Sequence, residues 1–271
     1  VTGLTPSPTA TATVSYRVML ARAVTGLTAA NFAVTGPSGS GVSSVTGSGA
    51  TYTVTVGTGT GSGPLQLRVV NDTGLSAELS NLPYDAGTTY TITRSFGTTP
   101  RLVLRGAGNA RGTDDVTAFV DAVQLLQNGV PVAGALPNAG FETNNVAAGG
   151  FRYESQGVVA APWAFSQQAG VARGGSGFGA APSADGDAVV FLQSAGTAHG
   201  SVAQELTLAA GSYQVGFRVA QRNYSTRDQV VDVFLNDVLL GSIQPSSTAA
   251  YETFTSPVFE VQATPLPVEL T

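Results

Sequence analysis

The sequence contains no cysteine and no lysine, and its 271 residues include only one Met, one Trp and one His. Without thiols, the chain cannot form disulfides or a zinc–thiolate site. Without lysine, it cannot form a Schiff base, a P-loop phosphate site or a Lys–Asn isopeptide crosslink. All 12 basic residues are arginine.

Charge is also scarce, because charged residues make up 11% of the chain and the formal net charge is −5. An acidic chain is a poor partner for nucleic acid, which selects basic patches. No apolar run reaches the ~20 residues of a membrane-spanning helix, so we expect no transmembrane segment. The 42% hydrophobic content is sufficient for a packed core.

The apolar residues alternate with small polar residues through most of the chain. Val14, Tyr16 and Val18 share one face of segment 13–20, and segment 51–56 shows the same pattern. Gly- and Pro-rich turns separate such segments. The alternation predicts an all-β protein with negligible helix, and the length favours two domains.

About seven short strands are predicted over the first 95 residues, which suggests an immunoglobulin-type sandwich. The segments on which this comparison rests are Val14–Val18, Ala23–Phe32, Ser44–Val56 and Thr89–Ile92. In their order and composition they resemble a bacterial Ig-like module, of the kind repeated in large secreted adhesins. We therefore expect an Ig-like β-sandwich over residues 1–96.

A second β-rich region is predicted over residues 97–263. Its Pro137–Glu142, Pro162–Trp163, Gly186–Gln193 and Val231–Asn236 segments resemble galactose-binding-like jelly rolls, the fold of many carbohydrate-binding modules. The resemblance implies a jelly-roll β-sandwich. Residues 264–271 are expected to form a linker, and they resemble the linker that precedes the sorting region of type IX secretion cargo.

The terminal strands of this jelly roll are expected to come first in the chain. The pattern that usually ends such modules is found at residues 117–125, after a plausible penultimate strand at 102–105. Residues 99–127 would thus complete the jelly roll through the apolar side chains of Leu102, Leu104, Phe119 and Val123. Completion could occur within the chain or in a neighbouring molecule, which would build a filament, or the chain could be cut from a tandem array.

Acidic residues suggest a structural calcium site. The jelly-roll resemblance implies Asp121 and Glu142 as ligands, which lie 21 residues apart in the sequence. Asp185 and Asp187 are a second, weaker candidate pair. Calcium requires six to eight oxygen ligands from carboxylates and carbonyls. The alternative is that Asp121 lies at a strand edge and that the other acids are solvated.

Aromatic and donor side chains suggest a glycan-binding surface. Trp163 and Tyr224 could provide rings for stacking on sugars, and Arg222 and Arg227 could provide donors. The alternative for Trp163 is a place in the core. Catalysis has less support, because His199 lies in a turn-like segment and the acids fall in turns. We therefore expect no enzymatic activity.

The sequence leaves two functions open. The first is a non-catalytic structural or adhesive module of a bacterial cell surface, with self-assembly into a fibre as one form. The second is a carbohydrate-binding module of a larger secreted protein. Both place the protein outside the cell. Because the sequence begins at Val1 without an initiator Met, we also expect it to be a processed or excised piece.

Overall fold

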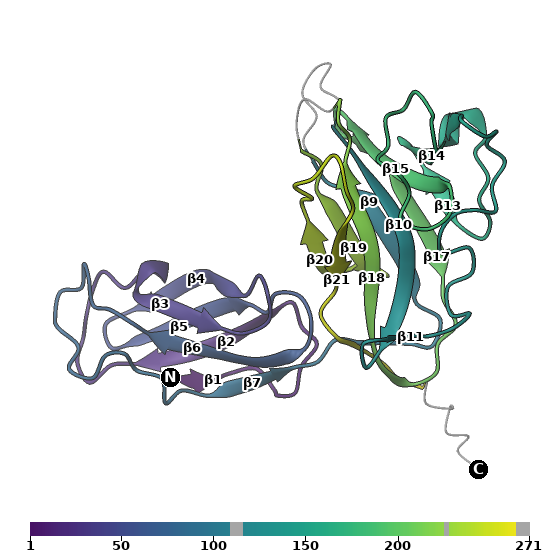
Figure 1. Ribbon diagram of the computed structural model, residues 1–271. Coiled ribbons are helices and arrows are strands. Elements are labelled where there is room, and N and C mark those ends of the chain that lie inside the picture. Colours follow the sequence, from purple (N-terminus) through teal and green to yellow (C-terminus); the bar gives the residue numbers. More distant parts are fainter. Residues whose placement is uncertain (109–115, 225–227, 264–271) are drawn as a thin grey trace, which may run out of the picture. The chain divides into compact units, whose positions relative to one another are not determined.

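The computed structural model describes residues 1–108, 116–224 and 228–263 (Figure 1). The chain divides into two compact units, Val1–Ser95 (unit 1) and Phe96–Thr271 (unit 2). Nearly all regular structure is β, which confirms the predicted fold class. Among the described residues, the helical elements are two 3₁₀ turns, η1 (Ala29–Asn31) and η2 (Glu154–Gln156), and none forms a helix that could span a membrane.

Unit 1 is built from seven strands in two sheets. The strands are β1 (Thr2–Gly3), β2 (Thr13–Met19), β3 (Phe32–Thr35), β4 (Gly41–Ser48), β5 (Thr51–Gly57), β6 (Gly63–Val69) and β7 (Thr89–Ile92). One sheet has the order β1-β2-β5-β4 and the other the order β3-β6-β7. Seven strands agree with the number expected over the first 95 residues.

Alternation of side chains explains the core of unit 1. Along β2 the residues Val14, Tyr16 and Val18 point to one face, and all three are buried. Tyr16 packs edge-to-face on Tyr90 of β7, with ring centroids 5.0 Å apart. The two sheets therefore close one hydrophobic core within residues 1–95.

The first segment of unit 1 runs parallel to its last strand. The N–H of Thr88 donates to the carbonyl of Val1 at one end of β7, and the N–H of Thr93 donates to the carbonyl of Thr9 at the other end. Thr9 also forms a parallel bridge with Ile92. The chain therefore enters unit 1 beside one end of β7 and leaves it at the opposite end.

Unit 2 contains two larger sheets. Its strands are β8 (Ser95–Phe96), β9 (Arg101–Gly106), β10 (Val116–Gln127), β11 (Val130–Pro131), β12 (Phe151–Tyr153), β13 (Ala164–Ser166), β14 (Ala169–Arg173), β15 (Ala188–Ala195), β16 (Ala198–His199), β17 (Ser201–Glu205), β18 (Gly211–Gln221), β19 (Val231–Leu235), β20 (Val238–Ile243), β21 (Glu252–Thr255) and β22 (Phe259–Val261). The five-stranded sheet has the order β13-β17-β9-β19-β20. The ten-stranded sheet follows the path β12-β14-β15-β10-β18-β22-β8, with β11, β16 and β21 beside it.

The early strands β9 and β10 lie in the interior of these sheets. β9 pairs with β17 on one side and with β19 on the other. β10 pairs with β15 and β18 in the same way. All of these partners belong to the same chain, so β9 and β10 each provide a central strand to one sheet instead of covering an edge.

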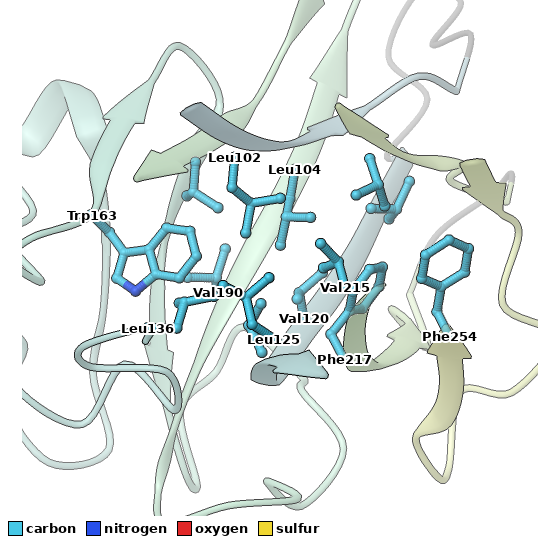
Figure 2. Packing of buried hydrophobic residues seen from close by; sticks show 14 of the residues in the cluster. Leu102, Leu104, Val120, Leu125, Leu136, Trp163, Val190, Val215, Phe217 and Phe254 are labelled. Atoms are coloured by element: carbon cyan, nitrogen blue, oxygen red, sulfur yellow. The ribbon is translucent and has the colours of Figure 1, made fainter. Parts of the chain in front are cut away.

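The main core of unit 2 lies between its two sheets (Figure 2). Leu102 and Leu104 of β9 point into it and are fully buried, as is Val120 of β10. At one side of the view, Trp163 lies beside Leu136 within the same cluster.

A bulge changes which face the side chains of β10 occupy. The register of β10 against β18 shifts between Asp121 and Gln124, and Ala122 has a positive φ of 49°. Phe119 belongs to a second cluster on the outer face of the ten-stranded sheet, whereas Val123 lies in the main core. Phe119 and Val123, which were both expected to complete the jelly roll, therefore lie on opposite faces, because a bulge inserts an extra residue into the alternation.

Candidate functional site

Asp121 accepts hydrogen bonds from a loop that is distant in sequence. Its side chain is fully buried. Oδ2 accepts the N–H groups of Ala184 at 2.7 Å and Asp185 at 2.9 Å, and the hydroxyl of Ser183 at 3.3 Å. Oδ1 accepts the N–H of Ala122 at 2.7 Å. Burial raises the pKa of Asp121, and these hydrogen bonds oppose that shift.

Two further carboxylates hold the same loop, which joins β14 to β15 and is called here the covering loop (residues 174–187). Glu142 Oε1 accepts the N–H groups of Asp187 and Ala188 at 2.8 and 2.7 Å. Asp187 Oδ2 accepts a hydrogen bond from Arg173 Nε at 2.8 Å, and Asp187 Oδ1 accepts one from the N–H of Gly174 at 3.1 Å. The acids predicted as calcium ligands thus fix both ends of the covering loop.

These residues do not fit a shared calcium ion in this arrangement. Calcium is held by oxygen atoms, whereas the groups that face Asp121 and Glu142 Oε1 are hydrogen-bond donors. Asp185 is exposed and takes part through its backbone N–H. Within residues 1–108, 116–224 and 228–263, no group of three or more His, Asp or Glu side chains is placed to hold a metal.

The covering loop packs on the outer face of the ten-stranded sheet. Its Phe178 is buried and stacks on Phe191 of β15, with ring centroids 4.2 Å apart. It also contacts Phe119 of β10 edge-to-face at 5.9 Å. This outer cluster is separate from the main core, so the loop protects aromatic side chains that would otherwise face solvent.

A row of four planar side chains extends from the covering loop to the surface. Phe178 contacts Phe151, with ring centroids 4.9 Å apart. The guanidinium of Arg222 lies 4.0 Å from the centroid of the Phe178 ring and 6.0 Å from the centroid of the Tyr224 ring. Phe151 is 43% exposed and Tyr224 is 67% exposed. We call Phe151, Phe178, Arg222 and Tyr224 the aromatic row.

The backbone of the covering loop positions the members of the row. Arg222 Nε donates to the carbonyl of Phe178 at 2.7 Å. A side chain at Gly179, which has a φ of +78°, would meet the Tyr224 ring at 2.8 Å. Glycine therefore allows Tyr224 to lie against the loop backbone.

The predicted ligand-binding residues fall into three groups. Tyr224 and Arg222 belong to the aromatic row. Trp163 lies in the main core with 5% of its side chain exposed, and its Nε1 donates to the carbonyl of Asn138 at 2.9 Å. Both faces of its ring are therefore unavailable for stacking on a sugar. Arg227 lies outside the described residues.

His199 lies in a short hairpin instead of an exposed loop. It belongs to β16, which pairs with the end of β15, and its Nδ1 lies 2.9 Å from Ser194 Oγ. Ser194 is 1% exposed, and its hydroxyl also accepts Gln229 Nε2 at 3.0 Å. A nucleophile must reach its substrate, so burial favours a structural role for this pair.

Phe151 is a surface residue of the aromatic row that the sequence pattern does not predict. Phe151 lies in β12, a strand of three residues that is too short to show alternation. Its neighbour Tyr153 packs on Phe191 at 4.7 Å. The only feature of the sequence that could indicate this surface is the presence of aromatic residues at positions 151, 153 and 178.

A hollow in the described part of the chain lies within unit 1. Its volume is about 460 Å³, and its lining includes Val18, Leu20, Leu79 and Leu82. No predicted site residue contributes to it.

Comparison with known proteins identifies no relative. No protein-family model, curated protein or solved structure matches the chain.

Proposed function

We propose that the chain is a non-catalytic extracellular module with a structural or adhesive role on a bacterial cell surface. The observation that carries the proposal is the path of the chain through unit 1, which enters at one end of β7 and leaves at the other. Units with this path extend a protein lengthwise when they are joined in series.

The two strand arrangements support the expected resemblances. The seven strands of unit 1 have the order of an immunoglobulin-type sandwich, which agrees with a bacterial Ig-like module. Unit 2 buries its core between two mainly antiparallel sheets, as a jelly roll does. The low charge of the sequence also suits a secreted surface protein.

The pairing of β9 and β10 bears on the form of the module. Strand donation between molecules requires a strand that can leave its own unit. Leu102, Leu104 and Phe119 lie on strands that have partners on both sides within the chain. This arrangement supports a module that is closed within one molecule over a fibre built by strand exchange.

Labelling of intact cells tests the proposed location. Antibodies raised against the purified chain are applied to cells that produce the protein, before and after permeabilisation. We expect full labelling of intact cells, while a cytoplasmic control protein is labelled only after permeabilisation. Labelling of the chain that also requires permeabilisation contradicts the proposal.

Carbohydrate binding is the second candidate, and the aromatic row favours it. Sugars stack on exposed aromatic rings, and Phe151 and Tyr224 present such rings on a support formed by Phe178 and Arg222. Hydrogen bonds to Asp121 and Glu142 hold the covering loop beneath them. The ligand surface would then lie on the outer face of the ten-stranded sheet, away from Trp163.

A panel of soluble cello-, xylo-, manno- and galacto-oligosaccharides tests this candidate by calorimetry. For a sugar that binds, Phe151→Ala and Tyr224→Ala should each weaken binding about tenfold, or about 1.4 kcal/mol. Met19→Ala, which changes an exposed side chain of unit 1, is the matched control. Failure of the whole panel, or equal affinity in all variants, contradicts carbohydrate binding through the aromatic row.

A further inference from the structure

The contact between the first segment of unit 1 and β7 has a specific mechanical geometry. It is called here the terminal contact (residues 1–11 with 88–94). Backbone hydrogen bonds join Thr88 to Val1 at 3.2 Å, and join Thr9 to Thr91 and Thr93 at 2.9 Å each. Because the two segments are parallel, pulling the ends of unit 1 apart slides one along the other.

Two hydrogen bonds that involve side chains also join the first segment to β7. The N–H of Thr5 donates to the Tyr90 hydroxyl at 2.8 Å, and the N–H of Thr91 donates to Ser7 Oγ at 2.8 Å. Under tension along the chain, these bonds and the backbone bonds are loaded together. Separation then requires many bonds to break at once.

Arg94 closes the terminal contact at the exit from unit 1. Its side chain is 6% exposed. Nη1 donates to the carbonyl of Ala10 at 2.7 Å, and Nη2 donates to the carbonyl of Gly59 at 2.7 Å and to Thr58 Oγ1 at 2.8 Å. One side chain thus joins the entering segment, the exit and the turn after β5.

Unit 2 is connected to the chain in the opposite way. The chain enters unit 2 at Phe96 and leaves it at Gln262. The N–H of Gln262 donates to the carbonyl of Phe96 at 2.9 Å, so entry and exit lie side by side. The Phe96 ring also packs on Phe259 of β22. Tension between residues 96 and 262 therefore acts directly across this pairing and breaks its bonds one after another.

We propose that unit 1 is the mechanically stronger unit of the chain and that unit 2 opens first under tension. The inference rests on the proposed function, because only a module of a surface-attached protein is pulled lengthwise. The terminal contact provides the resistance of unit 1, and the adjacent entry and exit of unit 2 make that unit the weaker one in this direction.

Single-molecule pulling of the full chain, with handles fused at both ends, tests the order of opening. An extended residue spans at most about 3.6 Å, so opening unit 1 releases up to about 340 Å of chain and opening residues 96–262 releases up to about 600 Å. These lengths identify each event. We expect the longer release at the lower force. The shorter release at the lower force, or equal forces, overturns the proposal.

The direction of pulling provides a control that does not depend on overall stability. The chain has no cysteine, so Ala86→Cys introduces a single attachment point near the Val1 end of β7. Pulling between this cysteine and the first residue peels the contact from one end. Unit 1 should then open at a clearly lower force than under end-to-end pulling, and an unchanged force overturns the proposal.

Variants separate the terminal contact from the rest of unit 1. Arg94→Gln should lower the end-to-end opening force of unit 1 and leave that of unit 2 unchanged. Arg68→Gln, which alters a pair with Asp85 outside the contact, should leave both forces unchanged. If Arg94→Gln does not fold, Ser7→Ala removes one bond of the contact and should give a smaller decrease. An unchanged force in both variants overturns the role of the contact, whereas the surface-labelling result is independent of it.

Discussion

Replacing Asp121 should loosen the covering loop and destabilise unit 2. Asp121→Ala removes the buried acceptor of the Ala184 and Asp185 N–H groups and of the Ser183 hydroxyl. Hydrogen bonds to a charged group contribute about 1.5–3 kcal/mol each, but removing a buried charge recovers part of this energy. We therefore expect unit 2 to lose about 2–4 kcal/mol of its free energy of unfolding.

Thermal unfolding and proteolysis measure the two effects. For a unit of this size, the loss corresponds to a decrease in melting temperature of about 5–15 °C. Trypsin should also cleave faster after Arg173, which lies at the start of the loop. Asp237→Ala, in an exposed turn, is the control and should cost less than about 0.5 kcal/mol. Equal stability and equal cleavage in the two variants would refute the assigned role of Asp121.

The remaining predictions concern pH, Trp163 and calcium. Burial raises the pKa of Asp121 above its ordinary value of 3.8, so just above that value the folded state holds a proton that the unfolded state has lost. The free energy of unfolding should therefore fall as pH rises through this window, and Asp121→Asn should remove that slope; a slope of opposite sign contradicts the prediction. Trp163→Ala should lower the free energy of unfolding, measured in urea, by about 3–5 kcal/mol because it leaves a cavity in the main core. A stable variant that only loses glycan binding would show instead that Trp163 is a ligand-binding residue. Changing from EDTA to millimolar Ca²⁺ should not move the melting temperature, because the carboxylates already accept N–H groups. A bound calcium ion, at a free concentration of about 100 times its Kd, would instead add about 2.7 kcal/mol to the free energy of unfolding and contradict this prediction.

Strands with a regular alternation could be predicted from the sequence. Residues 13–20 and 51–56 correspond to β2 and β5. In each, β-branched and aromatic residues recur at every second position, and this pattern is local. Pro257 lies between β21 and β22 and separates them, because proline cannot donate to a ladder of backbone hydrogen bonds.

Short strands and strands buried on both faces were harder to predict. β12, β13 and β14 have three to five residues each, which is too few for a period to appear. β20 was also missed, since its Leu239–Leu240 and Gly241–Ser242 pairs break the alternation. The bulge at Ala122 is set by pairing with β18, which no local pattern reveals.

The candidate site depends on contacts between distant segments. Asp121 and Glu142 could be identified from the sequence as one candidate pair of acids, and Asp185 and Asp187 as a second one. Whether oxygen atoms or N–H groups face them is decided by the path of the covering loop. Similarly, Tyr224 and Arg222 were visible as candidates, but Phe151 joins them only through Phe178, 27 residues further along the chain.

The mass of the chain in solution tests most directly that both units close within one molecule. Light scattering should give the mass of a single chain at every concentration, because β9 and β10 already have partners on both sides. A mass that rises with concentration, or filaments that disappear on Phe119→Asp while the variant stays folded, would contradict closure within the chain.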